Sequence, residues 1–267
     1  MITRFAPSPT GPLHLGHAYS AMVAHDMAVA KNGTFLLRIE DIDQTRARRK
    51  WEDQICDDLT WLGLRWPAPV MRQSDRISVY QNTIKTFWNQ QLIYPCLCRR
   101  KDILAATSAP QESAPLIGPD GVIYPGTCRG RTAQTDPIPT AAALRMDMTK
   151  ACALAGVSSE LAHTAGDIVI SRRDMGTSYH LSVVVDDAAQ GVTDVVRGKD
   201  LEDATPVHIL LQILLGLPTP KYHHHKLIRD ENGKRLAKRD DARALSKYRA
   251  EGATPNDIRR LVGLPEV

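Results

Sequence analysis

The sequence lacks several features that would assign a 267-residue chain to a special class of protein. No apolar run approaches the length of a membrane span, which argues against a membrane-spanning helix. The N-terminus has no signal-peptide pattern, so we expect a cytoplasmic protein. Internal repeats and low-complexity tracts are also absent from the sequence. An ordinary globular chain remains, with one large domain or two small ones.

Cysteine is scarce, and neither sign of charge is in large excess. Five cysteines occur: Cys56, Cys96, Cys98, Cys128 and Cys152. In an intracellular chain, cysteines used this sparingly favour metal binding or free thiols over disulfides. The net charge of +4 permits a polyanionic partner without requiring one.

The most informative stretch that is present runs from Phe5 to His17. After a short apolar start and a loop rich in Pro and Gly, the residues from Leu15 to Ala30 are typical of a helix. His14 and His17 then lie at a helix N-terminus, where backbone N–H groups and the macrodipole favour an anion. Gly16 removes a side chain where a ligand would approach the backbone. The stretch predicts a nucleotide-phosphate site, with simple helix capping as the alternative.

The first ninety residues alternate in the manner of an α/β protein. We predict strands at Ile2 to Ala6 and Thr34 to Ile39, separated by the helix, and therefore a βαβ unit with a parallel sheet. Ligands of such sheets lie outside the carboxyl ends of the strands, where the His14 loop and Glu40 would both fall. Further elements are expected as helices at 50–62, 76–91 and 206–215, a helical segment at 241–264 that Gly252 and Pro255 interrupt, strand-like pieces at 141–148 and 166–172, and apolar segments at 183–185 and 192–196.

Residues 94–136 are rich in Pro, Gly and Cys and have weak periodicity, which is typical of an insertion held by something other than a core. Cys96 and Cys98, with the more distant Cys128, fit a structural zinc site. Tyr124 would be an unusual fourth ligand on chemical grounds alone. Cys56 and Cys152 lie outside this cluster and are expected to serve as small apolar residues.

Two further patterns are weaker on their own. Adjacent side chains of an extended segment point to alternating faces, so His223, His224 and His225 should not bind one ion together. The basic run from Gly233 to Arg239 contains Lys238 and could simply be a solvated surface.

The motifs together resemble those of a known family. Pro7-Ser-Pro-Thr-Gly11 followed by His14 and His17 resembles the HIGH signature of class I aminoacyl-tRNA synthetases, in the form found in the glutamate and glutamine enzymes. Arg235-Leu-Ala-Lys-Arg239 is similar to their KMSKS loop, although Arg235 and Ala237 depart from its first lysine and its serine. The resemblance implies a Rossmann-like α/β core and ATP, with Mg²⁺, as a substrate. His14, Gly16, His17 and Lys238 would contact ATP, and both histidines and the lysine would be catalytic.

The same resemblance implies a glutamate pocket. Arginine suits a carboxylate because its planar fork donates two bonds, whereas Glu40 would hold the substrate ammonium and the Tyr179 hydroxyl would be a neutral donor. Any one of these residues taken singly could form an exposed salt bridge instead. His224 matches a histidine that the family carries ahead of the KMSKS-like loop. The residues implied for glutamate are Arg4, Phe5, Ala6, Pro7, Ser8, Glu40, Tyr179 and Arg197.

Fewer than thirty residues follow Arg239, too few for the helical domain with which glutamyl-tRNA synthetases read the anticodon. A core without that domain resembles the glutamyl-queuosine tRNA(Asp) synthetases, which also share the Cys96, Cys98, Tyr124 and Cys128 arrangement. This implies transfer of glutamate to queuosine in the anticodon of tRNA(Asp), by a monomer. The alternatives are a truncated glutamyl-tRNA synthetase charging tRNA(Glu), a small nucleotidyltransferase, and a non-catalytic tRNA-binding relative.

On this interpretation the chain divides into four parts. We expect the first half of the catalytic domain at 1–92 and its second half at 166–230, separated by a zinc-bearing, acceptor-like insertion at 93–165. The KMSKS-like loop and a helical C-terminal segment would occupy 231–267.

Overall fold

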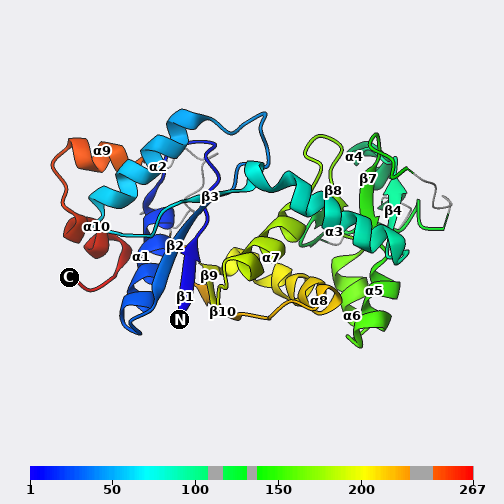
Figure 1. Ribbon diagram of the computed structural model, residues 1–267. Coiled ribbons are helices and arrows are strands. Elements are labelled where there is room, and N and C mark those ends of the chain that lie inside the picture. The colour runs from blue at the N-terminus through cyan, green and yellow to red at the C-terminus, as the bar shows by residue number, and fades with distance from the viewer. Residues whose placement is uncertain (108–116, 131–136, 229–242, 267) are drawn as a thin grey trace. The chain divides into compact units, whose positions relative to one another are not determined.

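The computed structural model describes residues 1–107, 117–130, 137–228 and 243–266 (Figure 1). The chain forms two compact units, which are described separately. Unit 1 comprises residues 1–75, 191–202 and 220–267, and unit 2 comprises residues 76–190 and 203–219. The functional domain boundaries expected from the sequence stay a prediction.

Unit 1 contains the predicted βαβ unit. Strands β1 (Ile2–Phe5) and β2 (Thr34–Ile39) pair in parallel, and α1 (Leu15–Val29) connects them. β3 (Met71–Arg72) extends this sheet in the order β1-β2-β3. A second parallel pair, β9 (Asp194–Gly198) and β10 (Lys221–His225), lies with β9 beside β1. The predicted strands and the connecting helix are thus confirmed, and the carboxyl ends of β1 and β2 meet at one edge.

Helix α1 lies against the sheet (Figure 1), and its small apolar residues belong to the core shared with the strands. Ala18, Ala21 and Met22 are fully buried, and the alanines allow the helix to lie close to the strands. The polar interruption at Asp26 is explained by an ion pair with Arg259 of α10 (Pro255–Val262), which joins this terminal helix to α1. The Arg259 guanidinium and the His25 side chain hold the pKa of Asp26 below its usual value, against the opposing effect of burial.

Two other helices of unit 1 follow the sequence expectation. α2 (Arg49–Trp61) buries Ile55 and Leu59 and begins one residue before the predicted start. The expected C-terminal helical segment is divided at Gly252 into α9 (Leu245–Ala250) and α10. Short 3₁₀ turns occur at Gln73–Arg76 and Lys199–Ala204.

Unit 2 is built on a small antiparallel sheet with the strand order β4-β7-β8. The strands are β4 (Ile93–Cys96), β7 (Ala143–Met146) and β8 (Val169–Ser171). Beyond β4 the chain forms α4 (Arg100–Thr107) and the hairpin strands β5 (Ile117–Gly118) and β6 (Gly121–Val122). The other helices are α3 (Ile77–Asn89), α5 (Met148–Ala155), α6 (Glu160–Ala165), α7 (Tyr179–Ala189) and α8 (Thr205–Leu215).

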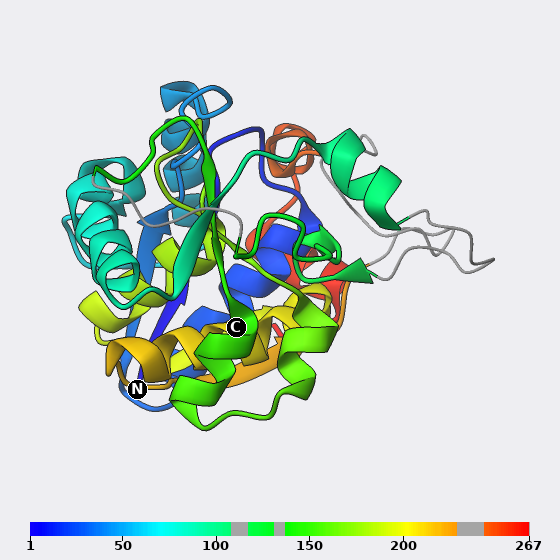
Figure 2. The same cartoon turned by 90° about the vertical axis from the view of Figure 1, so that its right-hand side faces the viewer.

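Helix α8, gold in Figure 2, packs against α7 and against the green pair α5 and α6. The apolar segment 183–185 lies within α7, although three β-branched residues in a row favour a strand. Two tertiary features support the helix. The Ser178 side chain caps its start, and the buried Asp186 accepts hydrogen bonds from Arg76 and Tyr80, each at 2.7 Å.

Among the residues that the structure describes, no helix is both long and apolar enough to cross a membrane.

Candidate functional site

Two histidines close the N-terminus of α1. His14 is the N-cap residue and its Nδ1 accepts the Gly16 N–H at 3.1 Å, while His17 Nδ1 accepts the His14 N–H at 3.2 Å. The two rings stack with their centroids 3.8 Å apart. The pair therefore satisfies backbone donors in the way that serine and glutamate side chains do in a capping box.

These bonds also decide the tautomers of both rings. A nitrogen that accepts a backbone N–H carries no proton, so in each neutral imidazole the proton lies on Nε2. The helix start thus presents Nε2–H donors in addition to the positive end of the helix dipole. His14 and His17 therefore do cap the helix, as the alternative interpretation of the sequence held. The same two rings also present N–H donors suited to an anion.

Gly16 has a structural reason of its own. A Cβ at this position would lie 3.1 Å from Cε1 and 3.2 Å from Nδ1 of His14, tighter than ordinary carbon contacts. The absence of a side chain therefore allows the His14 ring to fold over the helix start.

The carboxyl edge of β1 and β2 brings the first predicted glutamate-binding residues together. Glu40, directly after β2, donates its N–H to the Pro7 carbonyl at 3.0 Å, which joins it to the loop that continues through Ser8. Arg4 and Phe5 lie on β1, and both are buried. The Phe5 ring is edge-on to His17, with centroids 6.5 Å apart. Ala6 connects this strand to the loop.

Glu40 has a partner that the sequence interpretation did not assign. The fully buried Arg38 approaches it through Nη2, 3.2 Å from Glu40 Oε1. Residues two apart on a strand lie on the same face, so the spacing of this pair was a usable signal. The guanidinium thus pairs with the half-buried Glu40 side chain.

Arg197 lies on β9 and is 4% exposed. Its Nε donates to His224 Nε2 at 3.4 Å, and its guanidinium lies over the Tyr222 ring at 4.9 Å. Burial and the neighbouring Arg197 lower the pKa of His224, consistent with a neutral imidazole that accepts. His224 is thus a direct neighbour of a predicted substrate-binding arginine.

The chain returns to the histidine loop after residues 229–242. The Leu245 N–H bonds to the Leu13 carbonyl at 2.8 Å, and Ala244 forms a bridge with His14. Lys238 and the rest of the KMSKS-like motif lie outside the described residues.

Tyr179, the remaining predicted glutamate ligand, is the first residue of α7 in unit 2. Its ring lies against His180 and His208, with centroid distances of 5.5 and 5.6 Å. The other predicted glutamate ligands all belong to unit 1.

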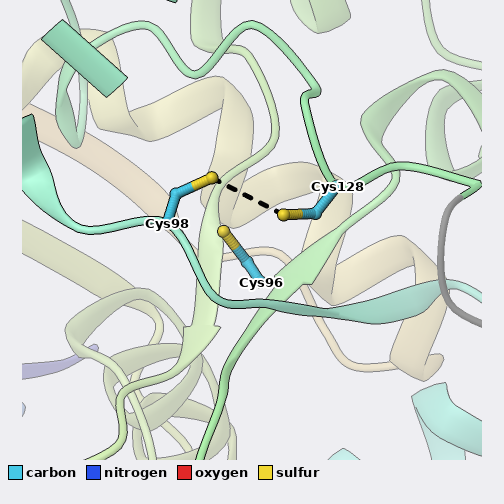
Figure 3. A group of neighbouring side chains, drawn as sticks. All are labelled: Cys96, Cys98 and Cys128. Atoms are coloured by element: carbon cyan, nitrogen blue, oxygen red, sulfur yellow. Dashed lines mark hydrogen bonds between the residues drawn. The ribbon is translucent and has the colours of Figure 1, made fainter. Parts of the chain in front are cut away.

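The predicted metal ligands of unit 2 converge in one cluster (Figure 3). The sulfurs of Cys96, Cys98 and Cys128 all lie within 4.8 Å of one another. Tyr124 Oη is 3.4 Å from the Cys96 sulfur and 3.5 Å from the Cys98 sulfur, and it accepts the Cys128 N–H at 2.8 Å. The sequence spacing had suggested the three cysteines, and the family resemblance had implied Tyr124.

The groups of the cluster differ in acidity, because burial raises the pKa of the Cys98 thiol and of the Tyr124 hydroxyl. Hydrogen bonds from Tyr124 and Leu97 lower the pKa of Cys128 to about 7, against the opposing effect of burial. The Arg145 guanidinium lies 4.0 Å from the centre of the Tyr124 ring, where it would stabilise a tyrosinate. Arg129, next to Cys128, donates two hydrogen bonds of 2.8 and 2.6 Å to the Asp167 carboxylate. Arg129 and Arg145 were not identified from the sequence, because their positions beside the cluster depend on contacts between segments that are distant in the sequence.

The three adjacent histidines behave as expected. His223 contacts Asp194 at 2.8 Å, His224 contacts Arg197, and His225 Nδ1 lies 2.9 Å from the Lys226 carbonyl. Each side chain thus has a different partner. Within the described ranges, the Cys96, Cys98 and Cys128 group is the one set of three or more His, Cys, Asp or Glu side chains close enough to share a metal.

Comparisons with known proteins agree on one family. The family described as "tRNA synthetases class I (E and Q), catalytic domain" matches residues 1–265. A Glutamyl-Q tRNA(Asp) synthetase from Rhodobacter capsulatus is 60% identical and aligns over 99% of this chain and 100% of its own length. A protein of the same name from Deinococcus radiodurans is 40% identical over 96% of this chain and 85% of its own.

Solved structures of glutamate tRNA ligases share the fold. One from Elizabethkingia meningosepticum, in complex with its amino acid, has a TM-score of 0.76 at 24% identity. The chain spans 60% of the length of that protein, while 98% of this chain is covered. The structure of glutamate-tRNA synthetase from Elizabethkingia anophelis has the same TM-score, with 61% of its length covered.

Proposed function

The chain belongs to the class I glutamate and glutamine tRNA synthetases, as one of their Glutamyl-Q tRNA(Asp) synthetases, and from this premise we propose its reaction. The enzyme is a ligase that activates glutamate with ATP and transfers it to queuosine in the anticodon of tRNA(Asp). The structural observation that carries the proposal is the double-histidine cap at the start of α1. Its Nε2–H donors share the carboxyl end of the β1–α1–β2 unit with Glu40.

The first step forms glutamyl-adenylate. A carboxylate oxygen of glutamate attacks the α-phosphorus of ATP, the bond to the β-phosphate oxygen breaks, and pyrophosphate leaves with that electron pair. His14 and His17 donate to the phosphate oxygens on which charge increases, and ATP brings Mg²⁺. Rate enhancement comes from positioning and electrostatics.

In the second step a hydroxyl of the queuosine cyclopentene ring attacks the glutamyl carbonyl. The carbonyl–phosphate bond breaks, AMP leaves, and the hydroxyl proton passes to solvent or to the departing phosphate.

The glutamate pocket is proposed at the ends of β1, β2 and β9. Arg4 and Arg197 are buried guanidinium groups able to hold carboxylates, and Glu40 is a half-buried carboxylate able to hold the ammonium. The loop from Phe5 through Ala6 and Pro7 to Ser8 is proposed to line the pocket. Tyr179, which lies in unit 2, is proposed as a glutamate ligand from the family resemblance alone.

Lys238 is proposed to neutralise pyrophosphate as it leaves. The support is the chain that follows it, because Ala244 is bridged to His14. Six residues of extended chain reach about 20 Å, so the lysine is within range of the phosphate site. Gly16, close to both histidines, would border the ATP phosphates.

A structural zinc ion is proposed at Cys96, Cys98, Tyr124 and Cys128. Zinc–sulfur bonds of about 2.3 Å in a tetrahedron require ligand atoms roughly 3.7 Å apart. The closest separations in the cluster are 3.4 to 3.5 Å, which suits three thiolates and an oxygen. Bound zinc would hold the insertion in place and take no part in the chemistry.

Cellular location, oligomeric state and domain boundaries are proposed from family membership and sequence alone. The cytoplasmic location is proposed because tRNA is the substrate. The monomeric state and the domain boundaries at 92, 165 and 230 are proposed as the sequence suggested.

The test is transfer of radiolabelled glutamate to tRNA(Asp) that carries or lacks queuosine. We expect labelling of the queuosine-containing tRNA alone, and release of the label with the modified base after nuclease digestion. Transfer to both forms of tRNA(Asp) would contradict the proposed acceptor.

A parallel reaction with tRNA(Glu) distinguishes the proposed function from that of a truncated glutamyl-tRNA synthetase, which would label tRNA(Glu). Glutamate-dependent exchange of pyrophosphate into ATP tests the adenylation step independently of any tRNA. Exchange that proceeds equally without glutamate would point to a small nucleotidyltransferase, and complete absence of exchange to a binding protein.

A further inference from the structure

Unit 2 contains a hydrogen-bonded chain of three side chains that lies outside the motifs. His180 of α7 contacts His208 of α8, with Nδ1 and Nε2 3.0 Å apart. Its other nitrogen, Nε2, lies 3.2 Å from Asp120 Oδ1, in the turn of the β5–β6 hairpin. His180 and His208 are buried, at 3% and 1% exposed.

The hydrogen bonds among these three side chains all point the same way, from His208 through His180 to Asp120. The Asp120 carboxylate only accepts, so His180 Nε2 carries a proton and donates to it. In the neutral ring His180 Nδ1 is then an acceptor, and His208 Nε2 donates to it. The second oxygen of Asp120 accepts the Val169 N–H at 2.8 Å, which joins the hairpin to β8. The pKa of Asp120 is lowered by the hydrogen bond from His180, against the opposing effect of burial.

Both histidines contact Tyr179, the residue proposed for the glutamate pocket. The three rings form a mutually packed group, with the two imidazoles 5.2 Å apart and each about as far from Tyr179. Rotation of His180 would break its bonds to Asp120 and His208, so the bonded chain limits the space in which Tyr179 can move.

The hairpin that supplies Asp120 also leads to the metal cluster. Tyr124 follows Asp120 by four residues, and the chain between them packs against Gly166. A Cβ on Gly166 would lie 2.7 Å from Ile123 and 3.2 Å from the Tyr124 nitrogen. The inserted segment therefore contributes a carboxylate to the support of Tyr179.

We propose that Asp120, His180 and His208 are positioning residues that fix Tyr179 for recognition of the amino-acid substrate. The inference rests on the proposed function, since it requires that Tyr179 contacts glutamate. It adds a role for the insertion in amino-acid binding, separate from any contact with tRNA.

The test measures KM for glutamate and for ATP in pyrophosphate exchange. Asp120→Asn and His208→Phe each remove one hydrogen bond of the chain while nearly preserving shape. We expect each to raise KM for glutamate roughly 5- to 20-fold, the range of one hydrogen bond to a charged or buried group, with KM for ATP unchanged. His208→Gln keeps an N–H donor and should recover most of the wild-type KM.

A double-mutant cycle identifies Tyr179 as the target. Tyr179→Phe should raise KM for glutamate, and adding Asp120→Asn to it should raise KM little further. His163→Phe, an exposed histidine of α6, is the matched control and should leave both KM values unchanged. Thermal midpoint and zinc content of each variant exclude unfolding and metal loss as the cause.

The two proposals fail in different ways. If wild-type exchange does not depend on glutamate, the proposed function is wrong. Suppose instead that wild-type exchange depends on glutamate. The positioning role is then overturned if Asp120→Asn and His208→Phe leave KM for glutamate unchanged, or raise KM for glutamate and KM for ATP equally. Additive effects in the double-mutant cycle would overturn it as well.

Discussion

Unit 1 and unit 2 hold their candidate sites by different physical means. In unit 1 the site is a product of regular structure, because two parallel strands end at one edge and a helix begins beside them. In unit 2 the site is a cluster of side chains, in which Cys96, Cys98, Tyr124 and Cys128 meet in a small core. The first site needs no ion to exist, whereas the second brings together groups that a metal would bind.

Because the two sites are held differently, the two units should respond differently to the loss of a side chain. Loss of a side chain in unit 1 should affect chemistry more than architecture, since the backbone carries the site. Loss of a side chain in the cluster should affect metal content first and activity second.

The largest effect is expected from His17→Ala. Loss of one donor to the developing phosphate charge should lower kcat of glutamate-dependent exchange by about 10²- to 10³-fold, or about 3–4 kcal/mol. Zinc content should not change. Steady-state kinetics and atomic absorption measure both quantities.

His17→Asn is the matched control for the capping bond. The amide oxygen can accept the His14 N–H, so stability should be restored while kcat stays low. If His17→Asn recovers kcat as well, the residue acts only as a helix cap and the comparison between the units fails.

The next effect is expected from Tyr124→Phe. Removing one of four ligands should weaken zinc binding roughly 10- to 100-fold, as judged by competition with a chromogenic chelator. Cys152→Ala, in the same unit and outside the cluster, should retain wild-type affinity. Unchanged affinity in Tyr124→Phe would limit the ligand set to the three cysteines.

The smallest effect concerns pH and Asp58 of α2 in unit 1. Both of its carboxylate oxygens are buried, and Gln54 and Arg249 offset only part of the cost of that burial. Burial and the neighbouring Asp57 raise its pKa to about 6. The pKa of Asp58 is thus higher in the folded state than in the unfolded state, where it is about 3.9. The charged carboxylate therefore destabilises the fold, and this effect is fully present above pH 6.

Asp58→Asn should therefore raise the free energy of unfolding by about 2 kcal/mol at pH 8. The gain should shrink as the pH falls through 6, where wild-type Asp58 takes up a proton, and be lost below about 4. Urea unfolding at pH 8, 6 and 4 measures it. A gain that is the same at all three values would contradict the assignment to Asp58.

Much of the fold could be predicted because its signals are local. The start of α1 follows from His14 and the Gly16 that succeeds it, and β2 from the apolar run ending at Ile39. The meeting of the His14 loop with Glu40 follows from the parallel βαβ rule alone. The segment 183–185 shows the limit, because its β-branched residues lie in a helix that long-range bonds to Asp186 support.

The sequence proposes members for the candidate sites, but it specifies few of the contacts among them. The cysteine spacing identified the cluster, yet the stacking of Arg145 on Tyr124 depends on β7 crossing beside it. The pairing of Arg38 with Glu40 could have been read from the alternation of a strand. The chain from Asp120 through His180 to His208 could not, because its members come from a hairpin and two helices.

By itself, the sequence determined which residue types gather at the start of α1, which strands pair in parallel, and which thiols are close along the chain. Those features depend on backbone propensity and on spacings of a few residues. Tertiary structure alone decided which partner each buried charged or polar group has, as for Arg197 with His224 and for His180 with Asp120. A hydrogen bond is directional and short, so its partners are selected by the packing of elements that sequence spacing does not specify.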